Sequence, residues 1–462
     1  MGLFSALNIA VSGLQAQAFA LQNISGNIAN SQTPGYKGIN TLFVDLMPNM
    51  PAGTQTSGGV IASSAPTNTI QGQIQASAIG TYMAINGQGF FPVKEGNNSA
   101  GGNGPTFPGG DLYTRRGDFQ LNAYGYLVNG SGYYLEGIPI NPITGNPSGT
   151  ALAPLQFSNA FLPANPTSTI TYGANLPSYP QTTNSDTTVP GSELLDPTDF
   201  VDGDPTVSGT GNVMGGVDTT TFMNESIDGG TITCYDGSGA AVNLEFRWAK
   251  TDSATLGAGH TDNWELFYQT NSNATTNASV SWVNAGTDFS FDSSGELSPA
   301  ITSINLTGVS VDGTSLGNLT FSLGGGLTQF STTSGATTVN SLQQDGYAAG
   351  QLQSLSVGSN GRISGSFTNG KTVDLAEIPL FSFASPDSLQ SLDGGAFAVT
   401  GDSGPALSGA SGQLVGASLE GSNADIADQF TQLIVTQQAY SANTRVITTA
   451  NEMSQDLLNI LR

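Results

Sequence analysis

The sequence predicts a multidomain α+β protein that is mostly β, with N- and C-terminal helices paired as a coiled-coil-like bundle and nested antiparallel β domains between them. Long helical hydrophobic periodicity occurs only at the two ends of the chain. Short alternating runs, separated by turn signals such as Asn86-Gly87 and Asn129-Gly130, fill the middle. The length of 462 residues is enough for about three domains, each with a core of its own.

An amphipathic helix is expected within residues 1–30, because apolar residues recur there at alternating steps of three and four. Its apolar stripe contains Leu7, Val11, Leu14, Leu21 and Ile28. The first 36 residues carry no charged side chain, whereas a solvated single helix usually carries charges on its polar face. We therefore expect several sides of this helix to be buried between subunits; an intramolecular hairpin of two helices is the alternative.

A second helix is expected at the other end of the chain, over residues 423–462. Asn423 is a good N-cap, and Asp425 and Asp428 follow in the first turns, where the helix dipole favours negative charge. Its apolar stripe contains Ile426, Phe430, Leu433, Val446, Met453, Leu457 and Ile460. Neither helix can bury its stripe alone, so we predict that residues 1–30 and 423–462 form a terminal helical assembly domain with the two stripes as its interface.

The sequence between the helices divides into three parts by composition and period. Residues 31–80 are rich in Gly, Ser, Thr, Gln and Pro with little periodicity, which predicts an extended linker. Residues 81–150 and 345–422 contain β-type runs and are expected to form a discontinuous first β domain. Residues 151–344 continue such runs without a helical period, which predicts an inserted outer β domain.

The composition argues against several classes of function. Ten Lys and Arg stand against 34 Asp and Glu, and the net charge of -24 repels both nucleic-acid phosphates and an anionic membrane surface. The N-terminus has no Lys or Arg ahead of an apolar block, so neither a signal peptide nor membrane insertion is expected. The single Cys234 and the single His260 exclude a disulfide framework within the chain and most catalytic or zinc-binding sets. We predict no enzyme activity, catalytic residue, metal or cofactor.

One acidic segment remains as a candidate metal site. Its members are Asp186, Glu193, Asp196, Asp199, Asp202 and Asp204. Carboxylates could supply oxygen ligands to Ca²⁺, but the segment lacks the residue order of a calcium-binding helix-loop-helix, so a solvated acidic loop is expected. Cys234 is expected as a small buried hydrophobe, and His260 as a surface residue.

A motif follows directly on the first helix. It comprises Asn27, Asn30, Thr33, Pro34, Gly35 and Tyr36. Pro34 and Gly35 forbid continuation of the helix, and Tyr36 can anchor the emerging strand. Placed after an uncharged amphipathic helix, the motif resembles the N-terminal signature shared by the rod and hook axial proteins of the bacterial flagellum. The resemblance extends over residues 85–91, 113–119, 122–127 and 437–443.

Within this family, the middle of the chain looks like that of hook proteins, over residues 326–330, 344–350 and 369–383 and in the length of its insertion. The resemblance implies a structural subunit that self-assembles into the hook, a curved flexible tube outside the cell that acts as a universal joint and transmits motor torque to the filament. Implied partners are further copies, the flagellar rod, the hook cap, the hook-filament junction proteins and the flagellar export apparatus, which would export the chain without a cleaved signal peptide.

Two alternatives remain at this point. One is a distal rod-type axial protein of the same family. The other is a secreted β-rich adhesin, for which Trp248, Trp264 and Trp282 would supply stacking platforms.

Overall fold

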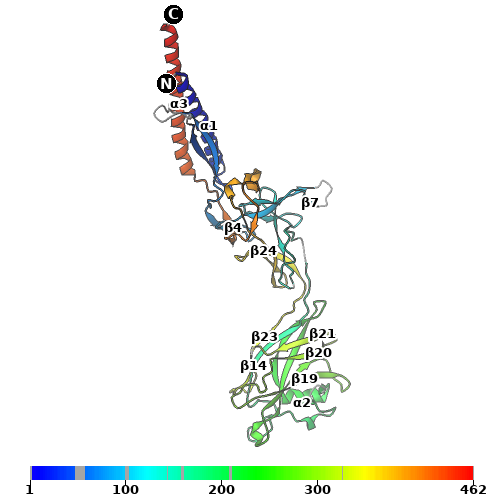
Figure 1. Ribbon diagram of the computed structural model, residues 1–462. Helices are drawn as coiled ribbons and strands as arrows, with labels where there is room; N and C mark the ends of the chain where they lie inside the picture. The colour runs from blue at the N-terminus through cyan, green and yellow to red at the C-terminus, as the bar shows by residue number, and fades with distance from the viewer. Residues whose placement is uncertain are drawn as a thin grey trace. The chain divides into compact units, whose positions relative to one another are not determined.

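The computed structural model describes residues 3–46, 58–98, 104–142, 144–157, 161–207, 211–324 and 326–460, without the side chains of residues 3 and 457–460. The chain divides into two compact units, Met1–Ala160 with Leu352–Arg462, and Phe161–Gln351. Strands predominate, and long helices stand near both ends of the chain (Figure 1). The predicted fold class is therefore confirmed.

The two long helices lie side by side in the first unit; they are α1 (Leu3–Ala29) and α3 (Ile426–Ile460) (Figure 1). The start of α3 corrects the prediction, because Asp425 rather than Asn423 caps it. Asp425 Oδ1 accepts a hydrogen bond from the backbone N–H of Ala427 at 2.7 Å. Asn423 Nδ2 instead donates to the carbonyl of Thr67 at 3.1 Å and to its hydroxyl at 2.9 Å. Asn423 thus fastens the chain just ahead of the helix.

The expected extended linker over residues 31–80 contains three strands in its described parts, 31–46 and 58–80. Strands β1 (Ile39–Asp45) and β2 (Val60–Pro66) form an antiparallel hairpin that packs against α1. Strand β3 (Ile74–Ala76) pairs with β32 (Ser418–Glu420), which lies just ahead of α3 in the sequence. The prediction was wrong because these strands are supported by a helix and by a distant strand, neither of which composition reveals.

The other strands of the first unit form a β domain from two stretches of the chain. They are β4 (Met83–Asn86), β5 (Phe91–Glu95), β6 (Asn97–Asn98), β7 (Pro105–Thr106), β8 (Leu112–Thr114), β9 (Gln120–Leu121), β10 (Leu127–Val128), β11 (Tyr133–Pro139), β12 (Ala153–Pro154), β24 (Gly350–Val357), β25 (Arg362–Phe367), β26 (Thr372–Glu377), β27 (Phe381–Ser382), β28 (Gln390–Ser391), β29 (Ala396–Ala398), β30 (Leu407–Ser408) and β31 (Gln413–Gly416), with short 3-10 helices at Pro386–Ser388 and Asp393–Gly395. The main antiparallel order is β24-β25-β26-β11-β5-β8-β29-β28. Its core includes Phe91, Phe119, Leu135 and Ile363.

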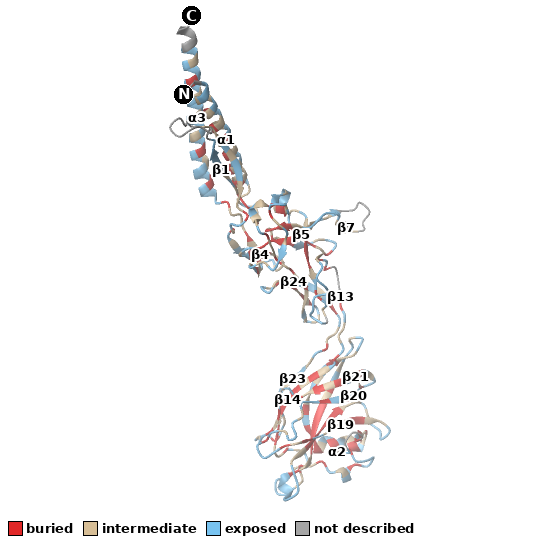
Figure 2. Cartoon of the chain, in the orientation of Figure 1, coloured by how far each residue is buried: buried red, intermediate tan, exposed pale blue. Residues whose placement is uncertain are grey.

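The described residues of the second unit form two five-stranded sheets and a short helix. Its elements are β13 (Phe161–Leu162), β14 (Thr169–Leu176), β15 (Asn212–Met214), α2 (Val217–Glu225), β16 (Ile227–Tyr235), β17 (Ala241–Asp252), β18 (Asn263–Gln269), β19 (Val280–Ser290), β20 (Ser303–Val311), β21 (Thr314–Ser322), β22 (Leu327–Gln329) and β23 (Thr338–Gln344), with 3-10 helices at Pro197–Asp199 and Ala254–Leu256. One sheet has the order β20-β21-β14-β22 with β23 on β14, and the other β15-β19-β18-β17-β16. The two sheets share one aromatic core that includes Tyr172, Trp248 and Phe321. Figure 2 shows buried residues along the strands of this unit.

Two features of the second unit differ from the prediction. Strand β14 runs parallel to β21 and β22, because the long connection between them permits a parallel return; this sheet is mixed rather than antiparallel. Helix α2 was not expected: it has nine residues, three of them Thr, and only Phe222 supplies a buried apolar side chain, so no helical period is visible.

Candidate assembly interface

The buried side of α1 consists mainly of small residues. Ala10, Ala16 and Ala20 are buried there, and a Cβ on Gly13 would lie 3.0 Å from Nδ2 of Asn443 in α3. Short side chains at a contact let two helices approach closely. We infer that α1 uses this side to pack within the chain. Ile24 is the one larger apolar side chain of α1 that is buried within the described part of the chain, and the others are left for other contacts.

The stripe predicted for α1 does not coincide with this buried side. Leu7, Leu14, Leu21 and Ile28 are half-buried, and Val11 is 36% exposed. The prediction placed these residues on one helical face, and the single chain leaves that face partly uncovered.

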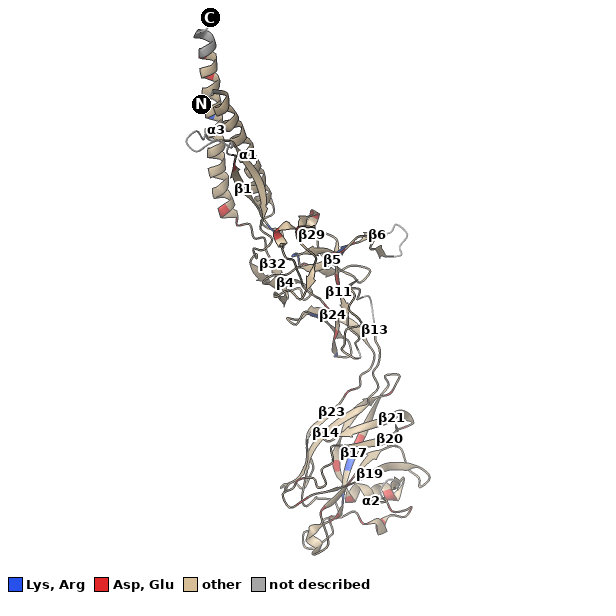
Figure 3. Cartoon of the chain, in the orientation of Figure 1, with Lys and Arg blue, Asp and Glu red and all other residues tan. Residues whose placement is uncertain are grey.

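The stripe predicted for α3 is more exposed still. Leu433 is half-buried, but Phe430 is 49% and Met453 63% exposed, and Ile426 and Val446 are also exposed. The side chains of Leu457 and Ile460 lie outside the described residues. Figure 3 shows few charged residues along either helix, so these apolar groups lie on nearly uncharged helices.

Other exposed apolar residues were missed from the sequence. On α3 they are Ile434, Val435 and Tyr440, and on the hairpin Leu42, Val44 and Ile61. Val44 lies directly opposite Ile61 in the hairpin register. The run Leu433-Ile434-Val435 was a visible signal, whereas the hairpin residues lay within the supposed linker.

Asn27 of the motif joins three parts of the chain at the C-terminal end of α1. Its Nδ2 donates to the carbonyl of Ile39 in β1 at 3.0 Å and to Oε1 of Gln429 in α3 at 3.1 Å. Its Oδ1 accepts from the backbone N–H of Ile39 at 2.9 Å and from the Tyr36 hydroxyl at 3.2 Å. A buried amide with this set of partners fixes helix, hairpin and second helix to one another.

The rest of the motif makes the turn after α1. Asn30 Nδ2 donates to the carbonyl of Gly26 at 3.0 Å, and the Thr33 hydroxyl donates to Asn30 Oδ1 at 3.2 Å; Pro34 follows directly. Gly35 has φ +66, and a Cβ there would lie 2.7 Å from the Arg116 backbone, so this position requires glycine.

Three charged side chains meet just beyond the motif, and we call them the root triad: Lys37, Arg115 and Glu420. All three are almost wholly buried. Lys37 Nζ lies 2.6 Å from Glu420 Oε1, and Arg115 Nη1 lies 3.6 Å from Glu420 Oε2. Burial lowers the pKa of Lys37 and of Arg115, and the Glu420 carboxylate opposes that shift in both. The root triad therefore joins the helix exit, the β domain and strand β32 by charge.

Backbone groups also bind the root triad. Lys37 Nζ also donates to the carbonyl of Ile70 at 2.7 Å, and Arg115 Nη2 to that of Gly87 at 2.7 Å. Glu420 Oε1 accepts from the backbone N–H of Gly72 at 2.9 Å. In the sequence, Lys37 and Arg115 belong to stretches that resemble the flagellar axial proteins, and nothing marks Glu420. The association of the three residues depends on tertiary contacts, which the sequence does not record.

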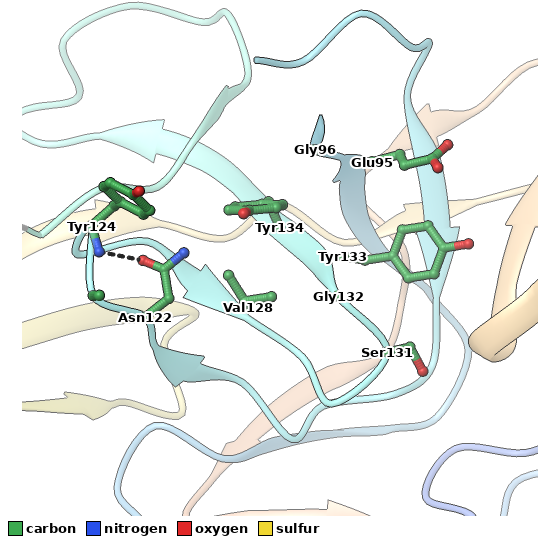
Figure 4. A pocket seen from close by; sticks show the side chains of 10 residues that line it. Glu95, Gly96, Asn122, Tyr124, Val128, Ser131, Gly132, Tyr133 and Tyr134 are labelled. Carbon is green, nitrogen blue, oxygen red and sulfur yellow. Dashed lines mark hydrogen bonds between the residues drawn. The ribbon is translucent and has the colours of Figure 1, made fainter. Parts of the chain in front are cut away.

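A hollow of about 520 Å³ opens on the first β domain (Figure 4). Tyr124, Tyr133 and Tyr134 line it, with Glu95 at one side, and Asn122 Oδ1 accepts from the backbone N–H of Tyr124 at 3.0 Å. Within the described part of the chain, no group of three or more His, Cys, Asp or Glu side chains could hold a metal ion. The hollow is an aromatic depression in the surface of this domain.

Four family models match along the chain. They are Flagella basal body rod protein over residues 7–37, Flagellar hook protein FlgE/F/G D1 domain over 84–171, Flagellar basal body protein FlaE D2 domain over 218–347, and Flagellar basal body rod FlgEFG protein C-terminal over 415–460. The first of these matches includes the motif after α1, and the last includes the helix α3.

Curated relatives match over the whole length. The flagellar hook protein FlgE of Brucella abortus is 28% identical, with all of both chains covered. The protein of the same name from Salmonella typhimurium is 29% identical, with 98% of each chain covered. The chain belongs to the flagellar hook protein family. A solved hook-family chain, FlgE2 of Helicobacter pylori, has a TM-score of 0.49 and 16% identity, covering 74% of this chain and 98% of that one.

Hook-family membership decides between the alternatives left open by the sequence. Full-length relatives named hook protein favour the hook over the distal rod-type reading. The adhesin reading loses its stacking platforms, because Trp248, Trp264 and Trp282 are all buried in the second unit. The family is structural rather than enzymatic.

The remaining candidates of the sequence have structural explanations. Cys234 is buried as predicted, and burial raises the pKa of its thiol to about 11. His260 is exposed as predicted, with Nδ1 2.8 Å from Asp252 Oδ1. Residues 4–29 of α1 are long and apolar enough to cross a membrane, a test that helices packed in proteins also pass; the absence of membrane insertion stays a prediction.

Proposed function

We propose that this hook-family chain polymerises through the exposed apolar stripes of α1 and α3. The observation that carries the proposal is that Phe430, Val446 and Met453 remain exposed on a helix that already has its partner within the chain. Burial of one such side chain contributes about 1.5–3 kcal/mol, and every subunit of a polymer would repeat the gain. Copies of the same helices are the proposed occupants of these stripes.

The resulting polymer would be the hook, a curved tube outside the cell that passes motor torque to the filament. In this proposal the terminal helices form its inner wall and the second unit is an inserted outer β domain. Rod, hook cap and hook-filament junction proteins would meet its ends, and the flagellar export apparatus would deliver the chain without a cleaved signal peptide. Polar β surfaces suit neighbouring subunits that slide as the bent tube rotates, because shallow polar contacts resist sliding less than deep apolar ones.

The test places a charge on the exposed part of each stripe, in Val11→Asp and Phe430→Asp. These positions are preferable to the half-buried Leu14, where a charge would also disturb packing within the chain. A carboxylate enclosed without a partner costs several kcal/mol, so we expect polymerisation of purified protein and cell motility to fail. The monomer should keep its melting temperature.

The matched control is Val217→Asp, the same change at an exposed valine of the second unit. It should assemble normally. Normal hooks from both stripe variants would refute the proposed interface, and a large loss of monomer stability would show that the stripes belong to an internal core.

A further inference from the structure

A segment of the second unit covers one face of the sheet β15-β19-β18-β17-β16, and we call residues 177–207 the acidic strap. Two of its apolar side chains, Leu195 and Phe200, enter a buried cluster with Phe222 of α2, Phe267 and Trp282. The backbone N–H of Leu195 also donates to the carbonyl of Lys250 in β17 at 2.8 Å. Five of the six acidic residues are exposed, as expected of a solvated loop, but Glu193 is buried and the segment packs on the sheet.

Buried carboxyl groups of the second unit hold the strap at three points. Glu225 Oε1 accepts from Asn184 Nδ2 at 3.1 Å, and its Oε2 from the backbone N–H of Asp196 at 3.2 Å. Asp218 accepts from the backbone N–H groups of Val201 and Asp202 at 3.0 and 3.1 Å.

The third point lies near the end of the strap. Asn284 Nδ2 donates both to the carbonyl of Pro205 at 3.0 Å and to Oε2 of Glu265 at 2.7 Å. Glu265 thus acts on the strap through an amide.

No ion pair found among the described residues neutralises the acids of the strap. The two cations on β17 pair with none of these acids: Lys250 Nζ lies 2.8 Å from Asp262 Oδ1 and donates to the carbonyl of Ser178 in the strap at 2.7 Å. Arg247 Nη2 donates to the carbonyl of Ser226 at 2.8 Å. Glu193 of the strap is 1% exposed, and neither of its carboxylate oxygens has a hydrogen-bond partner. The strap therefore adds negative charge beside buried carboxyl groups that have only uncharged donors.

We propose that the acidic strap is a pH-sensitive closure, held shut while Glu225 and Glu265 carry protons and loosened when they ionise. Ionisation would place Glu225 beside Asp199 of the strap, and Glu265 beside Asp204 of the strap and Asp288 of β19. The two glutamates are buried while the three aspartates are exposed, so solvent screens their repulsion only in part. In this proposal the strap is the part that moves away.

The titration of the two carboxyl groups agrees with this geometry. Burial, reinforced by Asp199, raises the pKa of Glu225 to about 7 against hydrogen bonds from Asp196 and Asn184. Burial, reinforced by Asp288 and Asp204, raises the pKa of Glu265 to about 8 against the hydrogen bond from Asn284. The closed strap binds these protons more tightly than the open one, so closure is favoured at low pH. It is lost as the pH rises from the ordinary pKa of a glutamate side chain towards 7 and 8.

Hydrogen exchange of the purified full-length monomer between pH 5.5 and 8 tests the proposal, with protection factors corrected for the intrinsic pH dependence of exchange. One carboxyl group of this kind raises the opening constant about tenfold per pH unit below its closed-state pKa. We expect the amides of Leu195, Val201 and Asp202 to lose at least about tenfold in protection over this range. Amides inside β17, such as that of Phe246, should stay constant as internal references.

The variants Glu225→Gln and Glu265→Gln replace a carboxyl group that titrates by a neutral amide of the same shape. Combining them should therefore abolish the pH dependence. The matched control is Glu296→Gln at an exposed carboxylate of the same unit, which should behave as wild type. Wild-type strap protection that does not change with pH would overturn the proposal, even if the double variant fails to fold. So would an unchanged pH dependence in a folded double variant, or a parallel loss at Phe246, which indicates unfolding of the whole unit.

Discussion

Replacement of Glu420 by Gln tests whether the root triad joins the helices to the first β domain. The amide keeps the shape and can still accept from Lys37 and Gly72, so the change removes mainly the charge. At an effective dielectric constant of about 20, unit charges at the observed separations of 2.6 and 3.6 Å attract by about 6 and 5 kcal/mol. Desolvation of three buried ions offsets much of this attraction, and loss of one buried partner typically costs about 3–5 kcal/mol.

The assay is calorimetry of the purified monomer. At about 2–4 °C per kcal/mol, the transition of the first unit should fall by about 10 °C in Glu420→Gln. The exposed Glu95→Gln in the same unit is the control and should melt as wild type. In a double-mutant cycle, Lys37→Met with Glu420→Gln should cost clearly less than the sum of the single changes, because the second change removes a cation already left unpaired. Strict additivity, or a shift of Glu420→Gln below about 2 °C, would refute the reasoning.

Two further predictions concern the backbone of the motif and the independence of the units. Gly35→Ala should destabilise the monomer by about 2 kcal/mol or more in denaturant unfolding, because of its positive φ and the Arg116 backbone; Gly26→Ala, where a Cβ meets nothing within 4 Å, should not, and equal effects would contradict this explanation. Deletion of residues 161–351 should remove one calorimetric transition and leave the other cooperative, since each unit has its own core; loss of both would mean that the units share a core.

Periodicity predicted the parts of the fold that repeat. Apolar residues at steps of three and four located both long helices, and alternation of apolar and polar residues located strands such as β17 and β18. A helix or strand with one buried face has apolar residues at the period of that element, so its sequence shows the pattern. Helix α2 was not predicted, because a single buried apolar residue, Phe222, in a Thr-rich helix gives no hydrophobic periodicity. The β1–β2 hairpin escaped because its covering element is α1.

Side-chain roles were less predictable than elements. The stripe on α3 was identified as apolar, but its exposure in the single chain depends on which side of α1 packs against α3. The packed side is the one with small residues, such as Ala16 and Ala20. Asn423 had the right residue type for a cap, yet tertiary hydrogen bonds to Thr67 outcompeted the local role. The buried charge of Glu420 follows from contacts hundreds of residues away along the chain, which no local pattern records.

The root triad also sets an order of events for a chain that emerges gradually, during synthesis or through a narrow passage. Lys37 arrives near the beginning, Arg115 next and Glu420 close to the end of the 462 residues. If the N-terminus leads, the two cations wait for their anion until almost the whole chain is out. Because partial burial of unpaired cations is costly, the emerging chain gains little by closing this region early. Completion of the first unit therefore awaits the arrival of the last tenth of the chain.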